Sequence, residues 1–225
     1  MQDKNAQKNS ICTFIHFSTT NDIPYHVQIY INQLSFFFEK VIVLTNNKSL
    51  QPNYEKLNDN ISFWFDENKG YDFGLFYRFS KSHNIFQYNR LGIVNDSNLL
   101  INSLQNVFDW ASRQSVDFWG IIDSSEKPWF STHENNYHIQ SHFIVLERKA
   151  VSMLPELFDS IHINEIYNEQ DTKKLRRLVI YNWEIKLSQF LLQKGLSSAS
   201  YLNAEELLSR YNNKNLNVTI DLYSE

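Results

Sequence analysis

The stretch Arg90-Leu-Gly-Ile-Val-Asn-Asp-Ser97 is a mostly apolar run that leads directly into three small polar residues. Short apolar runs bounded by polar residues are typical of buried strands, and ligands of open α/β sheets bind beyond the carboxyl ends of the strands. Oxygen ligands at that point suit a divalent cation that bridges a diphosphate. The stretch alone supports equally well a helix N-cap formed by Asp96 or Ser97.

Strands and helices are predicted to alternate on both sides of this stretch. Apolar patterning predicts strands at residues 11–17, 40–44, 61–65, 89–95, 117–122, 139–147 and 217–222. Apolar residues at helical spacing predict helices at residues 25–38, 75–83, 104–112, 148–158, 171–194 and 204–211. This alternation predicts an α/β fold with a mixed, mostly parallel sheet flanked by helices and a helical C-terminal part. We expect a disordered lead-in at residues 1–10 and one domain at residues 11–225.

Composition and charge exclude several classes of function. The 225 residues carry a net charge of -4, from 21 basic and 25 acidic side chains, so no basic excess exists for binding nucleic acid. The single cysteine, Cys12, excludes an intramolecular disulfide and fits a reducing compartment. The sequence contains no apolar run of the ~20 residues that span a bilayer, and its polar first ten residues lack a signal region. We therefore expect a cytoplasmic location.

A second motif, Lys69-Gly-Tyr-Asp-Phe-Gly74, is predicted to form a turn before a helix. Its two glycines permit close backbone approach to a ligand. Asp72 could then meet a nucleotide, and Arg78 on the following helix could reach a phosphate. The alternative is an ordinary turn with a solvent-exposed Asp72.

Two further segments carry polar and aromatic side chains. Asp117-Phe-Trp-Gly-Ile-Ile-Asp123 is predicted to be a buried strand that ends in a carboxylate, followed by a loop with Trp129 and Phe130. Such rings could stack on sugars or pack the loop onto the core. His138-Ile-Gln-Ser141 precedes the next strand and could hydrogen-bond sugar hydroxyls. The scattered histidines predict no zinc site, and His16 is interpreted as a structural residue of the first strand.

Glu184 lies in the long helix predicted at residues 171–194, directly after bulky aromatic and apolar side chains. A carboxylate of this kind that faces a cleft could act as a general base. The alternative is an ion pair on a solvent-exposed face, with Lys174, Arg177 or Lys186 as the partner.

Taken in order, these segments resemble a known family. The motifs Gly70–Gly74, Val94–Ser97, Asp117–Gly120 with Asp123, and His138–Ser141, together with the helix around Glu184, are similar to the rhamnan synthesis F family of bacterial polysaccharide glycosyltransferases over roughly residues 11–195. The resemblance implies a GT-A-like fold, with a nucleotide-binding part at about residues 11–100 and an acceptor part at about residues 101–225. It also implies transfer of a sugar, often rhamnose, from a nucleotide-sugar donor to a growing glycan.

The resemblance implies a role for each candidate residue. The donor would be bound by Thr19, Asn21, Lys69, Asp72, Arg78, Asn95, Asp96 and Ser97. The sugar or acceptor would be bound by Trp119, Glu126, His138, Gln140 and Ser141. By analogy with inverting enzymes of this fold, the catalytic base would be Glu184, with Asp123 as the second choice.

The sequence of this chain departs from the family pattern at the metal-binding motif. Related GT-A enzymes carry Asp-x-Asp, whereas this chain reads Asn95-Asp96-Ser97 with one carboxylate. The sequence therefore does not decide whether Asp96 binds Mg²⁺ or Mn²⁺. Lys69 or Arg78 could neutralise the leaving diphosphate instead. The expected partners are a nucleotide-sugar donor, a glycan or lipid-linked glycan acceptor, and a membrane face or an assembly partner. The alternative function is a non-catalytic carbohydrate-binding or scaffold protein.

Overall fold

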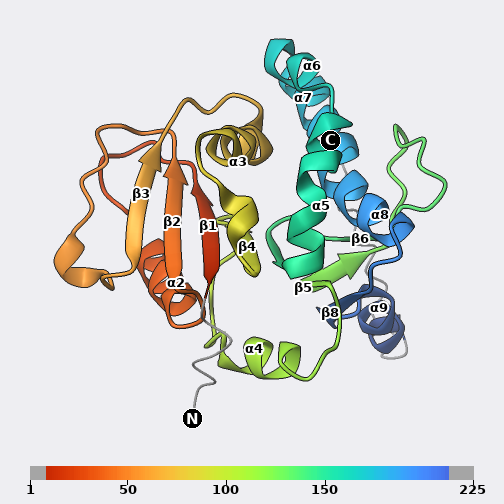
Figure 1. Ribbon diagram of the computed structural model, residues 1–225, viewed down its shortest axis with the longest axis horizontal. Helices are drawn as coiled ribbons and strands as arrows, with labels where there is room; N and C mark the ends of the chain where they lie inside the picture. Colours follow the sequence, from red (N-terminus) through yellow and green to blue (C-terminus); the bar gives the residue numbers. More distant parts are fainter. Residues whose placement is uncertain (1–8, 213–225) are drawn as a thin grey trace.

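The computed structural model describes residues 9–212 and is built around one mixed β-sheet (Figure 1). The strand order is β3-β2-β1-β4-β7-β5-β6, and β8 pairs with β5. The bounds are β1 Ser10–His16, β2 Lys40–Thr45, β3 Ile61–Phe65, β4 Arg90–Asn95, β5 Phe118–Ser124, β6 His138–Ile139, β7 Phe143–Glu147 and β8 Ser198–Leu202. Strands β3, β2, β1 and β4 are parallel, whereas β7 runs antiparallel to both β4 and β5. The predicted mixed α/β sheet is confirmed.

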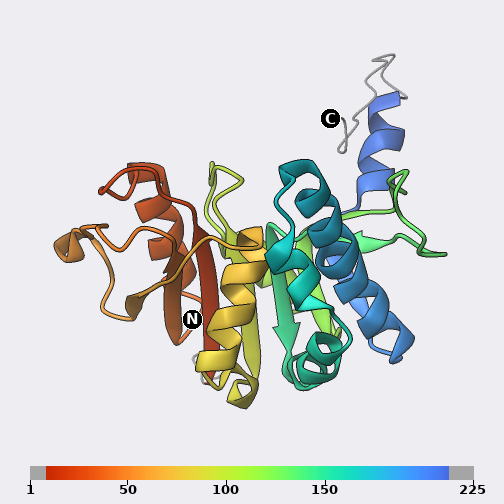
Figure 2. The same cartoon turned by 90° about the horizontal axis from the view of Figure 1, so that it is seen from above.

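Helices cover both faces of the sheet, because the strands are apolar on both sides. The helices are α2 Tyr25–Ser35, α3 Tyr71–Ser82, α4 Gln105–Ala111, α5 Arg148–Asp159, α6 Ile163–Asn168, α7 Thr172–Val179, α8 Lys186–Gln193 and α9 Ala204–Asn212. Along β1, Ile11 and Ile15 pack into the core beneath α3 and α5, and Cys12 and Phe14 pack into the core beneath α2. Figure 2 shows the N-terminal elements β1–β3 and α2 at one end of the molecule and the C-terminal helices at the other.

The structure differs from the predicted elements at several places, one of which is the unpredicted helix α6. Residues 70–74 are not a turn, since α3 already begins at Tyr71. The strand predicted at 139–147 is interrupted between β6 and β7. Strand β8 was not predicted, because its sequence Ser-Ala-Ser-Tyr-Leu lacks a clear apolar pattern and is specified by pairing with β5. The long predicted helix at 171–194 contains a π-helical segment, η3, at Ile180–Ile185.

The predicted ends of the chain fall largely outside the described residues. The lead-in was predicted to extend to residue 10, but Ser10 is buried and already belongs to β1. The strand predicted at 217–222 lies outside the described residues. Within residues 9–212, no helix combines the length and the apolar character that crossing a bilayer requires.

Candidate functional site

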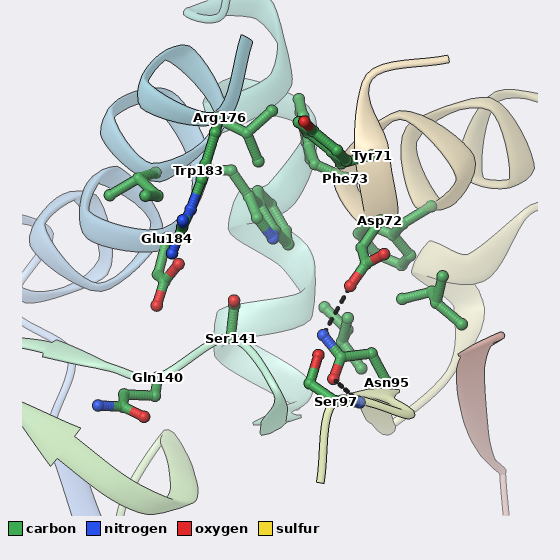
Figure 3. Close-up of a pocket in the computed structure, with 15 residues that line it drawn as sticks. Tyr71, Asp72, Phe73, Asn95, Ser97, Gln140, Ser141, Arg176, Trp183 and Glu184 are labelled. Atoms are coloured by element: carbon green, nitrogen blue, oxygen red, sulfur yellow. Dashed lines mark hydrogen bonds between the residues drawn. The ribbon is translucent and has the colours of Figure 1, made fainter. Parts of the chain in front are cut away.

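A cavity of about 450 Å³ lies at the carboxyl ends of β1 and β4 (Figure 3). The sheet contributes Ile15 and Asn95, α3 contributes Asp72, the β6–β7 connection contributes Ser141, and η3 contributes Glu184. Its position is the one where open α/β sheets bind ligands, and its volume is typical of a small-molecule site. The sheet therefore brings together side chains that are far apart in the sequence.

The start of α3 is shaped by its glycines. Gly70 and Tyr71 both have left-handed backbone angles, with φ values of 83° and 51°, which turn the chain sharply into the helix. Gly74 packs so closely against the preceding loop that an added Cβ would lie 1.8 Å from the carbonyl oxygen of Lys69. The motif predicted as a ligand-binding turn is thus a helix N-terminus, and it places Asp72 in the first helical turn, facing the cavity.

Asp72 and Asn95 form the floor of the cavity. The Nδ2 group of Asn95 donates a hydrogen bond of 2.6 Å to Oδ2 of Asp72, and Oδ1 of Asn95 accepts one from the backbone N–H of Ser97 (Figure 3). Burial raises the pKa of Asp72 from 3.8 to about 6; the Asn95 hydrogen bond opposes this shift, and the charges of Asp96 and Glu184 add to it. Asp72 therefore feels the charges of two other carboxylates, of which Glu184 also lines the cavity.

The raised pKa of Asp72 predicts a pH-dependent stability. Because the pKa is about 6 in the folded protein and near 3.8 in the unfolded chain, the folded state binds the proton more tightly. The free energy of unfolding should therefore fall as pH rises from about 4 to about 6, by an amount on the order of 2 kcal/mol. In Asp72→Asn this fall should be absent, and urea unfolding across this pH range measures it. The exposed Asp59→Asn is the control, and pH curves for Asp72→Asn that run parallel to those of the wild type would contradict the prediction.

The carboxylate of Asp96 points toward β1 and pairs with a histidine. Its Oδ2 lies 2.5 Å from Nδ1 of His16, whose side chain is 3% exposed at the end of β1. Among the described residues, Nε2 of His16 has no hydrogen-bond partner. Asp96 is not among the residues that line the cavity. It does not cap a following helix either, since α4 begins only at Gln105.

The donor set around Asp96 does not fit a protein-held divalent cation. His16 already occupies the carboxylate of Asp96, and Asn95 donates to Asp72. Within residues 9–212, no three His, Cys, Asp or Glu side chains are grouped as a metal site requires. We therefore derive no catalytic step through a metal ion.

Glu184 lies on the opposite wall of the cavity, in the π-helical segment η3 (Figure 3). Such π-helical turns are rare and occur frequently at functional sites. The preceding residue, Trp183, is buried and stacks on Phe73 of α3 with ring centroids 4.7 Å apart. This stacking fixes the helix against α3 and holds Glu184 beside the cavity.

Behind Glu184 lies His138, which is fully buried in β6. Its Nδ1 lies 2.7 Å from the carbonyl oxygen of Asn136, and because a carbonyl can only accept, Nδ1 carries the proton. The other ring nitrogen, Nε2, therefore faces Glu184, at 3.8 Å from Oε1. Two of the three ion-pair partners expected for Glu184 have other contacts, since Lys186 donates to the Ser160 carbonyl and Arg177 lies over the Trp129 ring.

Besides Asp96, four of the predicted donor-binding residues do not line this cavity. Thr19 and Asn21 are exposed in the loop after β1, where Asn21 accepts a hydrogen bond from Asn47. Lys69 is exposed, with its Nζ 5.7 Å from the centroid of the Tyr167 ring. Arg78 was expected to reach a phosphate, but its guanidinium donates to Asp66 and to the carbonyls of Glu67 and Lys69. Through these hydrogen bonds Arg78 stabilises the loop before α3.

The residues predicted along β5 also lie elsewhere. Asp123 was expected beyond the end of the strand, but it lies inside β5, where its buried carboxylate accepts hydrogen bonds from Ser200, Asn203 and the N–H of Ala204. This carboxylate ties β8 and the start of α9 to the sheet.

Trp119 and Glu126 are likewise remote from the cavity. Trp119 is 2% exposed and packs edge-on against Phe108 in the core, so its ring is inaccessible to a sugar. Glu126 lies partly exposed in the loop after β5, where its N–H donates to the Ser124 hydroxyl. Gln140 and Ser141, in contrast, line the cavity as predicted.

Arg176 is a site residue that the sequence interpretation missed. It lies on α7 and lines the cavity together with Val179, Ile180, Trp183 and Glu184. These positions recur at the three- and four-residue spacing that places side chains on one helix face. This spacing was the available signal, and Arg176 is the only Lys or Arg among the described residues that line the cavity.

Comparison with known proteins identifies a family. A family model described as rhamnan synthesis protein F matches residues 41–222. The chain matches no curated protein sequence.

Solved structures are similar to this chain only distantly. A putative glucose-1-phosphate thymidylyltransferase from Bacillus anthracis is similar at 9% identity and a TM-score of 0.47, covering 94% of this chain and 97% of that one. A 4-diphosphocytidyl-2C-methyl-D-erythritol synthase from Anaerococcus prevotii is similar at 12% identity and a TM-score of 0.44, covering 81% and 98%. Likenesses at this level say nothing about the activity of this chain.

Proposed function

This chain belongs to the rhamnan synthesis protein F family, and on that premise we propose that it is a GT-A-like glycosyltransferase of cell-surface polysaccharide synthesis. It moves rhamnose or a similar sugar from a nucleotide-sugar donor to a glycan or lipid-linked glycan acceptor. The observation that carries this proposal is the cavity at the ends of β1 and β4, with Glu184 on one wall and Asp72 on the other. A carboxylate base and a sheet-end ligand site are what sugar transfer requires.

In the proposed reaction, Glu184 is the general base. The oxygen of an acceptor hydroxyl attacks the anomeric carbon of the donor while the bond to the nucleoside diphosphate breaks. The bonding electron pair leaves with the diphosphate, and the hydroxyl proton passes to the carboxylate of Glu184. Holding both reactants in one cavity supplies much of the rate by removing the entropy cost of their encounter.

His138 supports Glu184 in this scheme. Its Nδ1–H donates to the Asn136 carbonyl, which orients Nε2 toward the carboxylate of Glu184. Nε2 of this buried ring lies 3.8 Å from Oε1 of Glu184, so the ring limits the positions that the carboxylate can adopt. His138 is therefore a positioning residue for the base.

Arg176 supplies the positive charge that a departing diphosphate needs. Asp72 and Glu184 would repel a diphosphate, so its favourable place in the cavity is near the Arg176 guanidinium. Arginine binds phosphates through paired, charge-assisted hydrogen bonds, and a fixed charge aimed at the developing negative charge lowers the barrier. Asp72 and Asn95 are left to bind hydroxyl groups of the donor.

A panel of nucleotide sugars tests the proposed function. Each donor is incubated with the protein, with and without Mn²⁺, and release of nucleoside diphosphate is measured together with the thermal shift. We expect at least one donor to raise the melting temperature and to release diphosphate. No release and no thermal shift with any donor would overturn the enzyme proposal, whereas sugar binding without release would support a non-catalytic carbohydrate-binding protein.

We expect Arg176→Ala to weaken donor binding by about 10- to 100-fold, because hydrogen bonds to charged groups contribute roughly 1.5–3 kcal/mol. Calorimetric titration with the donor found in the panel measures the change. The matched control is Arg113→Ala, which removes an exposed arginine after α4. Equal donor affinity of the Arg176 and Arg113 variants would refute the assigned role.

A further inference from the structure

A second cavity, of about 350 Å³, lies on another face of the helix that carries Glu184. Its apolar wall is formed by Phe130, Leu178 and Tyr181. The polar groups around it belong to Thr132, Glu169, Lys174 and Arg177. No part of the proposed reaction uses this cavity. We call it, together with the neighbouring Trp129, the aromatic groove.

The loop that forms one side of the aromatic groove is held in place by hydrogen bonds. The hydroxyl of Ser131 donates to Oδ1 of Asn136 at 2.5 Å, and the Asn136 amide donates to the His133 carbonyl at 3.1 Å. Oγ1 of Thr132 lies 2.8 Å from the hydroxyl of Tyr181, and the His133 ring packs on Tyr181 with centroids 4.4 Å apart. Figure 1 shows this loop, between β5 and β6, projecting beside the helices that end in α8. The loop is thus ordered before any ligand arrives.

Trp129 is presented to solvent by this ordered loop. It is 72% exposed, although burial of an indole is strongly favourable. The guanidinium of Arg177 lies 4.6 Å from its ring centroid, and Phe130 packs edge-on against it at 5.7 Å. These contacts orient the ring without covering it, so the remaining ring surface is available to a ligand. A rigid aromatic side chain binds with little loss of conformational entropy.

The chemistry of the aromatic groove fits a sugar chain. The C–H faces of a sugar pack on aromatic rings, and its hydroxyls need donors and acceptors at the edge of the same site. A 6-deoxy sugar such as rhamnose also has a methyl group, which suits the apolar wall of Phe130, Leu178 and Tyr181. Glu169 beside Lys174 and Arg177 supplies both an acceptor and donors.

We propose that the aromatic groove binds the acceptor glycan away from its reacting end; this rests on the proposed function. The helix joins the two sites, because Arg177 and Tyr181 face the groove while Arg176 and Glu184 face the first cavity. The two sites lie on different faces of this helix, which is roughly 10–12 Å across with its side chains. An oligosaccharide covers that distance and a single sugar does not. Binding energy from the remote sugars then helps to hold the reacting hydroxyl beside Glu184.

Direct binding of a rhamnose oligosaccharide, measured by calorimetry without any donor, tests the groove. We expect Trp129→Ala and Phe130→Ala each to weaken binding by about tenfold, as for loss of one well-stacked ring. Tyr54→Ala, which removes an aromatic ring that is 63% exposed on η1 (Tyr54–Lys56), is the matched control and should bind like the wild type. Unchanged affinity in both groove variants would overturn the proposal, even if transfer activity is found.

A second measurement separates this proposal from the proposed function. The donor-induced thermal shift should be the same in Trp129→Ala as in the wild type, because Trp129 does not line the first cavity. If no donor binds but the oligosaccharide does so through Trp129, the proposed enzyme fails and the groove stands. If Trp129→Ala instead loses binding to vesicles containing phosphatidylglycerol and keeps its oligosaccharide affinity, the groove is a membrane contact and the glycan proposal is overturned.

Discussion

Glu184→Gln should lower the rate of sugar transfer on the order of 10²–10⁴-fold, the range over which a positioned general base contributes. Glutamine has nearly the shape of glutamate but cannot accept the proton of the acceptor hydroxyl. Trp183, stacked on Phe73, fixes the helix independently of the Glu184 charge, so the variant should fold and bind the donor. The effect should therefore appear in kcat with little change in donor affinity.

Initial rates with the donor identified in the panel measure this prediction, with thermal unfolding as the test of integrity. The control is Glu165→Gln, which neutralises an exposed carboxylate on α6. If Glu184→Gln retains wild-type kcat while Glu165→Gln is also unaffected, the base must be another group. A loss of melting temperature that parallels the loss of rate would instead assign Glu184 a structural role.

Gly74→Ala should lower the free energy of unfolding by roughly 3 kcal/mol or more, at the upper end of what overpacking costs. The new Cβ would lie 1.8 Å from the Lys69 carbonyl oxygen and 2.7 Å from its carbon. Both are backbone atoms, so no side-chain rotation relieves the clash. The loop and the first turn of α3 must move apart, which also displaces Asp72 from Asn95.

Gly195→Ala is the matched control, because it also adds one methyl group. Gly195 has φ of 80° but no atom within 4 Å of the added Cβ. Its cost is conformational only, about 1 kcal/mol. Urea unfolding of the two variants compares them, and equal losses would mean that the loop before α3 adjusts freely. A Gly74→Ala variant that keeps wild-type donor affinity would show that the start of α3 does not position the site.

Much of the architecture could be predicted because it follows from local patterns. The strands predicted at 40–44, 61–65 and 89–95 correspond closely to β2, β3 and β4, since buried strands read as short apolar runs. The resemblance to the rhamnan synthesis F family, based on short motifs in order, is confirmed by the family match over residues 41–222. Strand β8 could not be predicted, because it depends on pairing with β5 and its own side chains carry little signal.

The site was predicted less completely, because a sequence motif does not say where a side chain points. Asp72, Asn95, Ser97, Gln140, Ser141 and Glu184 were predicted and do line one cavity. Asp123 and Trp119 were predicted from the same reasoning, yet one holds β8 and α9 and the other fills the core. Asp123 lies inside β5 because the strand continues to Ser124, and Trp119 fills the core because the side chains of this part of β5 are buried.

The stretch from Arg90 to Ser97 shows the difference between what the sequence determined and what only the tertiary structure decided. Its sequence alone determined that a buried strand carries polar groups to the edge of a sheet, because apolar periodicity is a local property. Only the tertiary structure decided that Asn95 faces Asp72 in the cavity while Asp96 turns back to His16. Successive side chains leave a strand in opposite directions, and which direction meets a ligand depends on elements packed there from distant parts of the chain. The same holds for Arg176, which becomes a site residue only because α7 and the end of β4 border the same cavity.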